Sequence, residues 1–188
     1  EGSTGTDVTG DGNKINNEGD TSATSGATGT NVDGNGNEIN NNGANSADGA
    51  GSTGTNVSGD DNTINSKGDT SAKNGATGTD ITGDGNKYNN TGDITAEGEN
   101  STGVNISGNK ATVDNEGEIN VSNGASGINI TGDDATVTNK GAITVSDNAT
   151  GIKITGDNAN VAQGGDISLP IATDGQGTLQ PGTGLDII

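Results

Sequence analysis

The chain of 188 residues contains no cysteine, histidine, methionine, tryptophan, phenylalanine or arginine. Without cysteine and histidine, the Ser-His and Cys-His nucleophile pairs, thiolate zinc sites and haem ligation by either residue are excluded. Without arginine, and with a net charge of -19, the chain is expected to repel a phosphate backbone, so we expect no nucleic-acid partner. The lack of cysteine is neutral about the redox compartment, although it is compatible with a secreted bacterial protein that avoids unwanted disulfides.

Large apolar side chains are also scarce, because hydrophobic residues make up 24% of the chain and aromatic residues 1%. A conventional globular core is therefore not expected, and the composition alone would also fit intrinsic disorder. Apolar residues that keep a strict register over a long period favour a folded repeat instead. No apolar run reaches membrane-spanning length and no signal peptide is evident, so we expect no membrane insertion and either a mature product or an excised fragment.

What the sequence has in abundance is repetition. The segment "TGTDVTGDGNKINNEG", which starts at Thr4, returns as "TGTNVDGNGNEINNNG", "TGTNVSGDDNTINSKG" and "TGTDITGDGNKYNNTG", and three looser copies follow. Three glycines recur in each copy at intervals of 24 or 25 residues and predict turns that need a positive φ. These glycines are Gly5, Gly29, Gly54, Gly78, Gly103, Gly127 and Gly151; Gly10, Gly34, Gly59, Gly83, Gly108, Gly132 and Gly156; and Gly19, Gly43, Gly68, Gly92, Gly117, Gly141 and Gly165.

Apolar residues between the glycines alternate with polar ones, which is the period of a strand with one buried face. The clearest apolar columns are Val8, Val32, Val57, Ile81, Ile106, Ile130 and Ile154, and Ile15, Ile39, Ile64, Tyr88, Val113, Val137 and Val161. A third column changes along the chain: Thr21, Asn45, Thr70, Ile94, Ile119, Ile143 and Ile167. Because the later members are larger and more apolar, we expect the C-terminal half to be the more stable half.

The frequent glycine, threonine and asparagine disfavour helix, so we expect an all-β chain. The sequence predicts a single-stranded parallel β-helix, or β-solenoid, over residues 1–169, with three short strands per coil of 24–25 residues and about seven coils. The segment 170–188, "PIATDGQGTLQPGTGLDII", breaks the pattern and is expected to be a linker or a cap of the last coil. The apolar residues that would form a cap are Ile171, Leu179, Leu185, Ile187 and Ile188.

A column of amides lies two residues after the second apolar column and should therefore point inward. It consists of Asn17, Asn41, Ser66, Asn90, Asn115, Asn139 and Gln163. Stacked amides can hydrogen-bond from coil to coil and to the turn backbone, so we expect an internal amide ladder rather than a ligand site. Tyr88, the one aromatic residue, should be buried in the apolar column.

Acidic residues form a column between the first and second strands of each coil and are a candidate calcium site, because Ca²⁺ prefers oxygen ligands. The column consists of Asp11, Asn35, Asp60, Asp84, Asn109, Asp133 and Asp157. A turn-forming role is the simpler interpretation of "GDGN" and "GDDN", so no metal-binding, cofactor-binding or catalytic residue is assigned. A second acidic column, which includes Asp20, Asp69 and Asp93, is expected to be a solvated face.

Many polysaccharide-processing enzymes are β-helices, and two carboxylates about 5 to 9.5 Å apart would suffice for glycoside hydrolysis. No pair of Asp or Glu residues is singled out, and no long loop interrupts the coils to build a cleft wall. Enzymatic function therefore stays a remote alternative, and the chain is expected not to be an enzyme.

The stretch "VDNEGEINVSNGASGINITGDDATVTNKGAITVSDNATGIKITGD", which starts at Val113, resembles the repeats in passenger domains of bacterial autotransporter adhesins. The resemblance extends over roughly Ser3 to Leu169. It implies a right-handed parallel β-helix that is extracellular, displayed at the bacterial cell surface and active in adhesion or aggregation.

Two functions from different classes follow. The first is a noncatalytic adhesion or spacer module that binds through an extended polar face, either to itself on neighbouring cells or to a host or surface glycan or protein. The second is a filament subunit whose ends stack axially, with the final "GLDII" docking on a neighbour.

Overall fold

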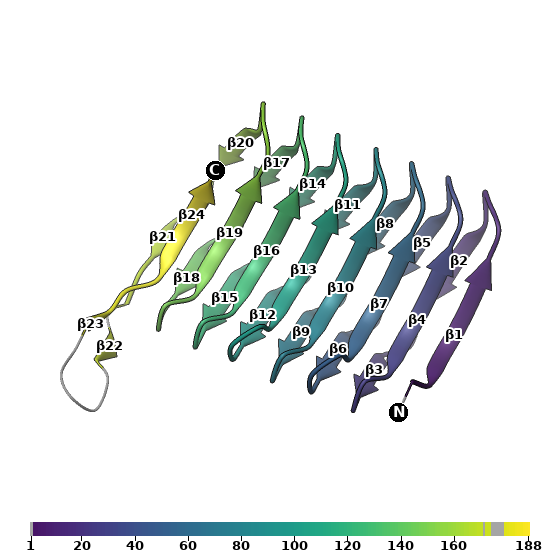
Figure 1. The fold of residues 1–188 in the computed structure, drawn as a ribbon, viewed down its shortest axis with the longest axis horizontal. Coiled ribbons are helices and arrows are strands. Elements are labelled where there is room, and N and C mark those ends of the chain that lie inside the picture. Colours follow the sequence, from purple (N-terminus) through teal and green to yellow (C-terminus); the bar gives the residue numbers. More distant parts are fainter. Residues whose placement is uncertain (1, 171, 174–178) are drawn as a thin grey trace.

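The computed structural model describes residues 2–170, 172–173 and 179–188. In these residues the chain is an all-β parallel β-solenoid of about seven coils, with three parallel sheets and no helix. Figure 1 shows the coils stacked along one axis from β1 to β24, with the two termini at opposite ends. None of the described residues belongs to a helix long and apolar enough to cross a membrane.

Each coil contributes one strand to each sheet. Sheet A contains β1 (Thr4–Thr9), β4 (Thr28–Asp33), β7 (Thr53–Ser58), β10 (Thr77–Thr82), β13 (Thr102–Ser107), β16 (Ser126–Thr131), β19 (Thr150–Thr155) and β24 (Thr183–Ile187). Sheet B contains β2 (Lys14–Asn17), β5 (Glu38–Asn41), β8 (Thr63–Ser66), β11 (Lys87–Asn90), β14 (Thr112–Asn115), β17 (Thr136–Asn139) and β20 (Asn160–Gln163). Sheet C contains β3 (Thr21–Thr24), β6 (Asn45–Asp48), β9 (Thr70–Lys73), β12 (Ile94–Glu97), β15 (Ile119–Ser122), β18 (Ile143–Val145) and β21 (Ile167–Ser168).

The register follows the sequence repeat. Ile81 of β10 pairs with Val57 of β7 on one side and Ile106 of β13 on the other, as the first apolar column requires. Tyr88 lies between Ile64 and Val113 in sheet B and is fully buried, so its predicted core position is confirmed. The extra residue of the 25-residue coils falls in the turn between sheets C and A, for example between β6 and β7.

The glycines serve two purposes, and the prediction that all three series need a positive φ is wrong for two of them. The second series has φ between 121° and 146°, which favours glycine. The first and third series have ordinary φ values and are needed for close stacking. A Cβ on Gly141 would overlap the carbonyl oxygen of Gly117 in the preceding coil, and a Cβ on Gly78 would overlap the Thr70 side chain.

The internal amide ladder is continuous in the last four coils. The Asn90 side chain donates to Asn115 Oδ1, Asn115 Nδ2 donates to Asn139 Oδ1 at 2.6 Å, and Asn139 Nδ2 donates to Gln163 Oε1 at 2.9 Å. Each amide also donates to the carbonyl of the glycine two residues later, as Asn115 does to Gly117 at 2.7 Å. The ladder ends at Ser66, which bonds to Gly68 within its own coil.

A second internal amide column was not predicted. It lies three residues after the second glycine of each coil and consists of Asn13, Asn37, Asn62 and Asn86, followed by Ala111, Ala135 and Ala159. The backbone N–H of Asn37 donates to Asn62 Oδ1, and that of Asn62 donates to Asn86 Oδ1, both at 2.8 Å. The constant spacing from the glycine and the change to alanine were the signals in the sequence.

The core therefore changes character along the axis. Buried polar residues are concentrated in the first four coils, whereas isoleucine, valine and alanine fill the last three. Most buried polar side-chain atoms that lack a hydrogen bond among the described residues also belong to the first three coils, including Asn37 Nδ2, Asn62 Nδ2 and Thr70 Oγ1. Since such atoms destabilise a fold, the structure supports the predicted stability difference between the two halves.

The segment after β21 returns to the solenoid. β22 (Ala172–Thr173) and β23 (Leu179–Gln180) pair antiparallel as a hairpin, and β24 then pairs parallel with β19 as the eighth strand of sheet A. Leu185 is partly buried and packs against the core, while Ile187 and Ile188 are exposed. Of the other residues expected to cap the end, Leu179 lies in β23 and Ile171 lies outside the described residues.

Candidate functional site

The acidic turn column is a structural ladder. Asp11 Oδ1 accepts a hydrogen bond from the backbone N–H of Asn35 in the next coil at 2.7 Å, and Asp133 Oδ1 accepts one from Asp157 at 2.9 Å. The four intervening pairs are Asn35 with Asp60, Asp60 with Asp84, Asp84 with Asn109, and Asn109 with Asp133. Asp and Asn serve equally because each bond needs a single side-chain oxygen, which explains why the column mixes the two.

The second acidic column bonds in the same way. Asp20 Oδ1 accepts from the backbone N–H of Ala44 at 2.9 Å, and Asp93 Oδ1 accepts from Glu118 at 2.9 Å. The expectation of a merely solvated face was therefore incomplete, because these carboxylates also tie successive coils together. Within the described part of the chain, no group of three or more Asp or Glu side chains is placed to hold a metal ion. The geometry thus accounts for both columns by their bonds to the backbone.

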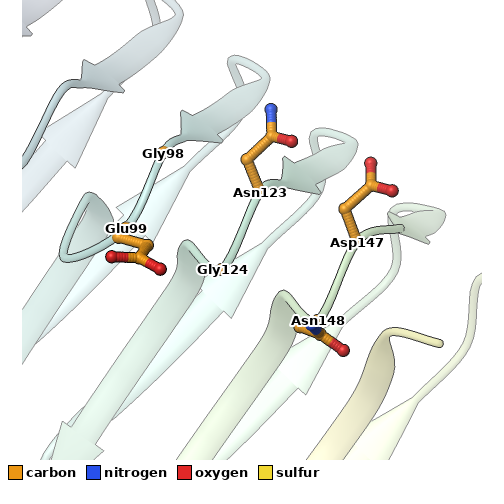
Figure 2. Close-up of a pocket in the computed structure, with 6 residues that line it drawn as sticks. All are labelled: Gly98, Glu99, Asn123, Gly124, Asp147 and Asn148. Atoms are coloured by element: carbon orange, nitrogen blue, oxygen red, sulfur yellow. The ribbon is translucent and has the colours of Figure 1, made fainter. Parts of the chain in front are cut away.

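An open hollow of about 360 Å³ lies over the turns between sheets C and A, in the C-terminal half. It is lined by Gly98, Glu99, Asn123, Gly124, Asp147 and Asn148. Figure 2 shows the carboxylates of Glu99 and Asp147 on different turns, with Asp147 and Asn123 directed away from Glu99. The N–H of Gly124 is bonded to the Asp147 carbonyl at 2.9 Å. This arrangement brings no two carboxylates toward one common point.

The outer face of sheet A carries a third ladder. Asn31 Nδ2 donates to Asp7 Oδ1, Asn105 Nδ2 donates to Asp80 Oδ1, and Asn129 Nδ2 donates to Asn105 Oδ1, each at 2.8 Å. Asn56 donates to Asn31 in the same manner at 2.7 Å. A column of hydroxyl-bearing or acidic residues lies two positions further along each strand: Thr9, Asp33, Ser58, Thr82, Ser107, Thr131 and Thr155. These residues form a regular row of polar groups that we call the sheet A face.

The outer face of sheet B combines amides with ion pairs. Asn40, Asn65 and Asn89 each donate to the asparagine of the preceding coil at 2.8–2.9 Å. The pKa of the Glu38 carboxyl is lowered mainly by the hydrogen bond that the Lys14 ammonium donates to it at 2.8 Å. A hydrogen bond from Asn40 lowers this pKa further. At the other end, the hydrogen bond to Glu116 raises the pKa of Lys140, aided by the nearby charge of Asp114. These pairs are solvent-exposed and contribute little to stability.

The two ends of the solenoid differ in chemistry. At the N-terminal end, an open hollow of about 480 Å³ is lined by hydroxyl and amide side chains, among them Thr6, Asn17 and Thr21. At the C-terminal end lie the large hydrophobic residues that are most exposed among those described: Ile167 at 40%, Leu169 at 44%, Ile187 at 52% and Ile188 at 70%. One end is therefore polar and the other apolar.

Comparisons with protein-family models, with curated proteins and with solved structures found no match to this chain. The surfaces themselves therefore carry the functional argument.

Proposed function

We propose that this chain is a noncatalytic adhesion and spacer module of a bacterial cell surface, of the kind found in autotransporter passenger domains. It is extracellular, and it binds through the sheet A face. Its partner is either the same module on a neighbouring cell or a glycan or protein of a host or surface.

The observation that carries this proposal is the amide ladder on the sheet A face. Asn31 is bonded to the coils on both sides of it, through Asp7 and Asn56, and Asn105 is bonded in the same way to Asp80 and Asn129. Binding to side chains that are already ordered avoids the entropy cost of fixing them on contact. A row that repeats at the strand spacing, roughly 4.8 Å, also suits a partner that is itself extended, because many weak contacts form together.

The spacer role is supported by the solenoid core. Sheets A, B and C run through every coil, so the coils cannot bend independently of one another. The outer surface carries most of the net charge of -19, which favours solubility and opposes nonspecific association with anionic surfaces. The module should therefore bind stably only to surfaces that form many hydrogen bonds with it at once.

The test uses beads coated with the purified chain. Bead-to-bead clustering measures self-association, and retention on chitin, cellulose and mucin surfaces measures binding to glycans and glycoproteins. The variant Asn105→Lys/Asn129→Lys breaks the ladder and places two cations on the sheet A face. We expect it to lose at least ten-fold in whichever activity the unmodified chain has, since several contacts are removed together.

The matched control is Thr95→Lys/Asn120→Lys. Both residues lie half-buried on the outer side of sheet C, in β12 and β15, so the control adds the same charge to neighbouring coils. It should keep the activity of the unmodified chain. Equal loss in both variants would contradict the assignment to sheet A, and dispersed beads that adhere to none of the surfaces would contradict adhesion altogether.

A second candidate is a filament subunit that assembles by axial stacking. The observation in its favour is the apolar C-terminal end, where Ile167 and Leu169 are exposed over open strand edges. Electron microscopy across a concentration series separates the two proposals, because axial stacking gives rods that lengthen with concentration, whereas a persistent single chain contradicts it.

A further inference from the structure

On a chain with a net charge of -19, one stretch of the sheet A face carries no acidic side chain. It covers the neighbouring strands β13 and β16, whose outward residues are Thr102, Asn105 and Ser107, and Ser126, Asn129 and Thr131. Next to this stretch the amide column continues with Asp80 of β10 on one side and Lys153 of β19 on the other. In Figure 1 these four strands lie side by side on one face of the molecule.

Along the solenoid axis the four residues of the amide column follow the order anion, amide, amide, cation. In the opposite direction the order is cation, amide, amide, anion, so the stretch is complementary to itself when a second copy lies antiparallel. A two-fold axis parallel to the strands, midway between two sheet A faces, produces this arrangement. It places Asp80 opposite Lys153 of the second copy and Asn105 opposite Asn129, and each of these pairs occurs twice.

The amides keep hydrogen-bonding capacity for such a contact. Asn105 Nδ2 donates to Asp80 Oδ1, and Asn105 Oδ1 accepts from Asn129 Nδ2, each at 2.8 Å. Because an amide has two N–H donors and two lone pairs, Asn105 retains one of each for an amide of the second copy. The same symmetry places Ser107 opposite Thr131, and a hydroxyl can both donate and accept.

The charge of Lys153 is also available to a partner. Asp186 of β24 is its neighbour in sheet A, but Lys153 forms no ion pair with any residue that the structure describes. An ammonium on a half-buried side chain can therefore pair with Asp80 of a second copy without first breaking an ion pair within its own chain.

Charge selects one register of the antiparallel contact. A shift of three coils brings Lys153 opposite Asp7 but places the two Asp80 carboxylates against each other on the two-fold axis. A shift of one coil in the other direction places Asp80 opposite Asp186. Like charges that face each other across a contact disfavour it strongly. Among the described coils, only the register centred between β13 and β16 pairs both Asp80 and Lys153 with opposite charges.

We propose that the sheet A face binds a second copy of this chain in an antiparallel orientation, and that the ion pairs of Asp80 with Lys153 set the register. The inference rests on the proposed function, because it names the partner of the face to which adhesion was assigned. It uses residues of β10, β13, β16 and β19 alone.

The contact is small enough to be reversible. Four strands about 4.8 Å apart, each of six residues that rise about 3.3 Å, form a face of roughly 20 by 20 Å. Both copies together then bury about 800 Å², which is typical of weak, transient contacts. The single chain should therefore prevail in dilute solution, whereas many copies on two facing surfaces should hold those surfaces together.

Two charge reversals on coated beads test the register. Beads of one colour carry Asp80→Lys, and beads of a second colour carry Lys153→Asp. Each variant alone should cluster at least about ten-fold less than the unmodified chain, because like charges face each other at both ends of the contact. In an equal mixture the two colours should cluster with each other, because opposite charges face each other again. Recovery on mixing also requires both variants to be folded.

The matched controls are Asp48→Lys and Lys87→Asp, which make the same charge changes at exposed positions of sheets C and B. Each should cluster as the unmodified chain does. Circular dichroism checks the fold of every variant. If a charge reversal prevents folding, the milder Asp80→Asn and Lys153→Gln test the same contact, since each removes both ion pairs and should also weaken clustering.

The outcomes separate this inference from the proposed function. Folded single variants that lose clustering without recovery on mixing would overturn the antiparallel register, and unchanged clustering of either single variant would overturn the role of the ion pairs. Unmodified beads that adhere to a glycan surface but stay apart from one another would overturn the inference and leave adhesion through the sheet A face standing. Beads that do neither would contradict both.

Discussion

Buried amides fill part of the core of this protein, which in most proteins is filled by large apolar side chains. Asn115 is fully buried, yet it accepts a bond from Asn90 and donates to both Asn139 and Gly117. Because each amide is fixed by its neighbours, a narrow polar column can be packed without leaving donors unpaired.

Asn115→Ala should therefore be strongly destabilising. The change removes three hydrogen bonds, leaves Asn139 Oδ1 without its donor and leaves the Asn90 amide with only its bond to the Gly92 carbonyl, so the free energy of unfolding should fall by about 2–4 kcal/mol. Urea denaturation followed by circular dichroism measures the loss. The control Asn120→Ala, on the outer side of β15, should change it by less than about 0.5 kcal/mol. Similar effects in the two variants would contradict an internal ladder.

Tyr88 offers a test by pH. Burial raises the pKa of its phenol, which bonds to Asn90 Oδ1 at 3.4 Å. Below pH about 10 the phenol is protonated in both states; above it the unfolded chain loses the proton while the native chain retains it, so stability should fall as the pH rises. The effect is measured by urea denaturation midpoints from pH about 8 to about 11, a range that includes the ordinary pKa of tyrosine. In Tyr88→Phe this decline should be smaller. If the Tyr88 phenol ionised in the folded chain as readily as in the unfolded chain, the buried position of Tyr88 would be contradicted.

At this scale the sequence predicted which residues point inward and that the column of Asn115 forms an internal amide ladder, but it did not predict the bonds of the turn residues. Alternation with polar neighbours identified the columns of Val8, Ile15 and Asn17. It could not show that Asp11 bonds to the backbone of the next coil, because that bond depends on side-chain rotamers and on the geometry of the turn. The Asn37 column was missed although its constant spacing from the second glycine was visible in the sequence.

At the scale of the element, stacked glycines set the distance between coils. The third glycine series has no need of a positive φ, and a side chain there would meet the carbonyl of the preceding glycine. The position in the coil therefore decides the cost of a substitution, and Gly19, where an added Cβ meets nothing within 4 Å, should differ from the rest of its series.

Gly141→Ala and Gly19→Ala form a matched pair in that series. An added Cβ overlaps the Gly117 carbonyl in the first case and meets nothing within 4 Å in the second. Gly141→Ala should lower the unfolding free energy by more than about 3 kcal/mol, since backbone must move. Gly19→Ala should be neutral or stabilising by up to about 1 kcal/mol. Thermal denaturation by calorimetry compares the two, and a harmless Gly141→Ala would contradict the close stacking of the turns.

The sequence predicted seven three-stranded coils, because the glycine intervals of 24 and 25 residues are regular. It did not predict β24 as the start of an eighth coil. The interval from Gly151 to Gly184 is 33 residues, and the hairpin of β22 and β23 takes up the difference. A search for glycine spacing alone cannot find a copy that follows an insertion.

For the whole molecule, the change from a polar to an apolar core implies an unequal distribution of stability. The array is quasi-one-dimensional, so each coil is stabilised mainly by its two neighbours. Coils with buried unpaired atoms, such as those of Asn37 and Asn62, should open before coils filled with Ile106, Ile128 and Ile130.

Native-state hydrogen exchange measures this difference directly. The amides of β4 and β5 should exchange through local openings of lower free energy than those of β13 and β16, with protection at least ten-fold weaker. Uniform protection from the second coil to the sixth would contradict the gradient and would indicate one cooperative unit.

The central claim is that equivalent residues of successive coils lie one above another at a constant spacing. Because the chain lacks cysteine, pairs of spin labels can be placed without background on the outward column of sheet A. Thr155 would be labelled together with Thr82, Ser58 or Asp33, which lie three, four and five coils away. Electron–electron distances should be narrow and should grow by roughly 4.8 Å per coil, although each step adds 24 or 25 residues of sequence. Broad distributions, or distances that do not rise in equal steps, would contradict the stacked solenoid.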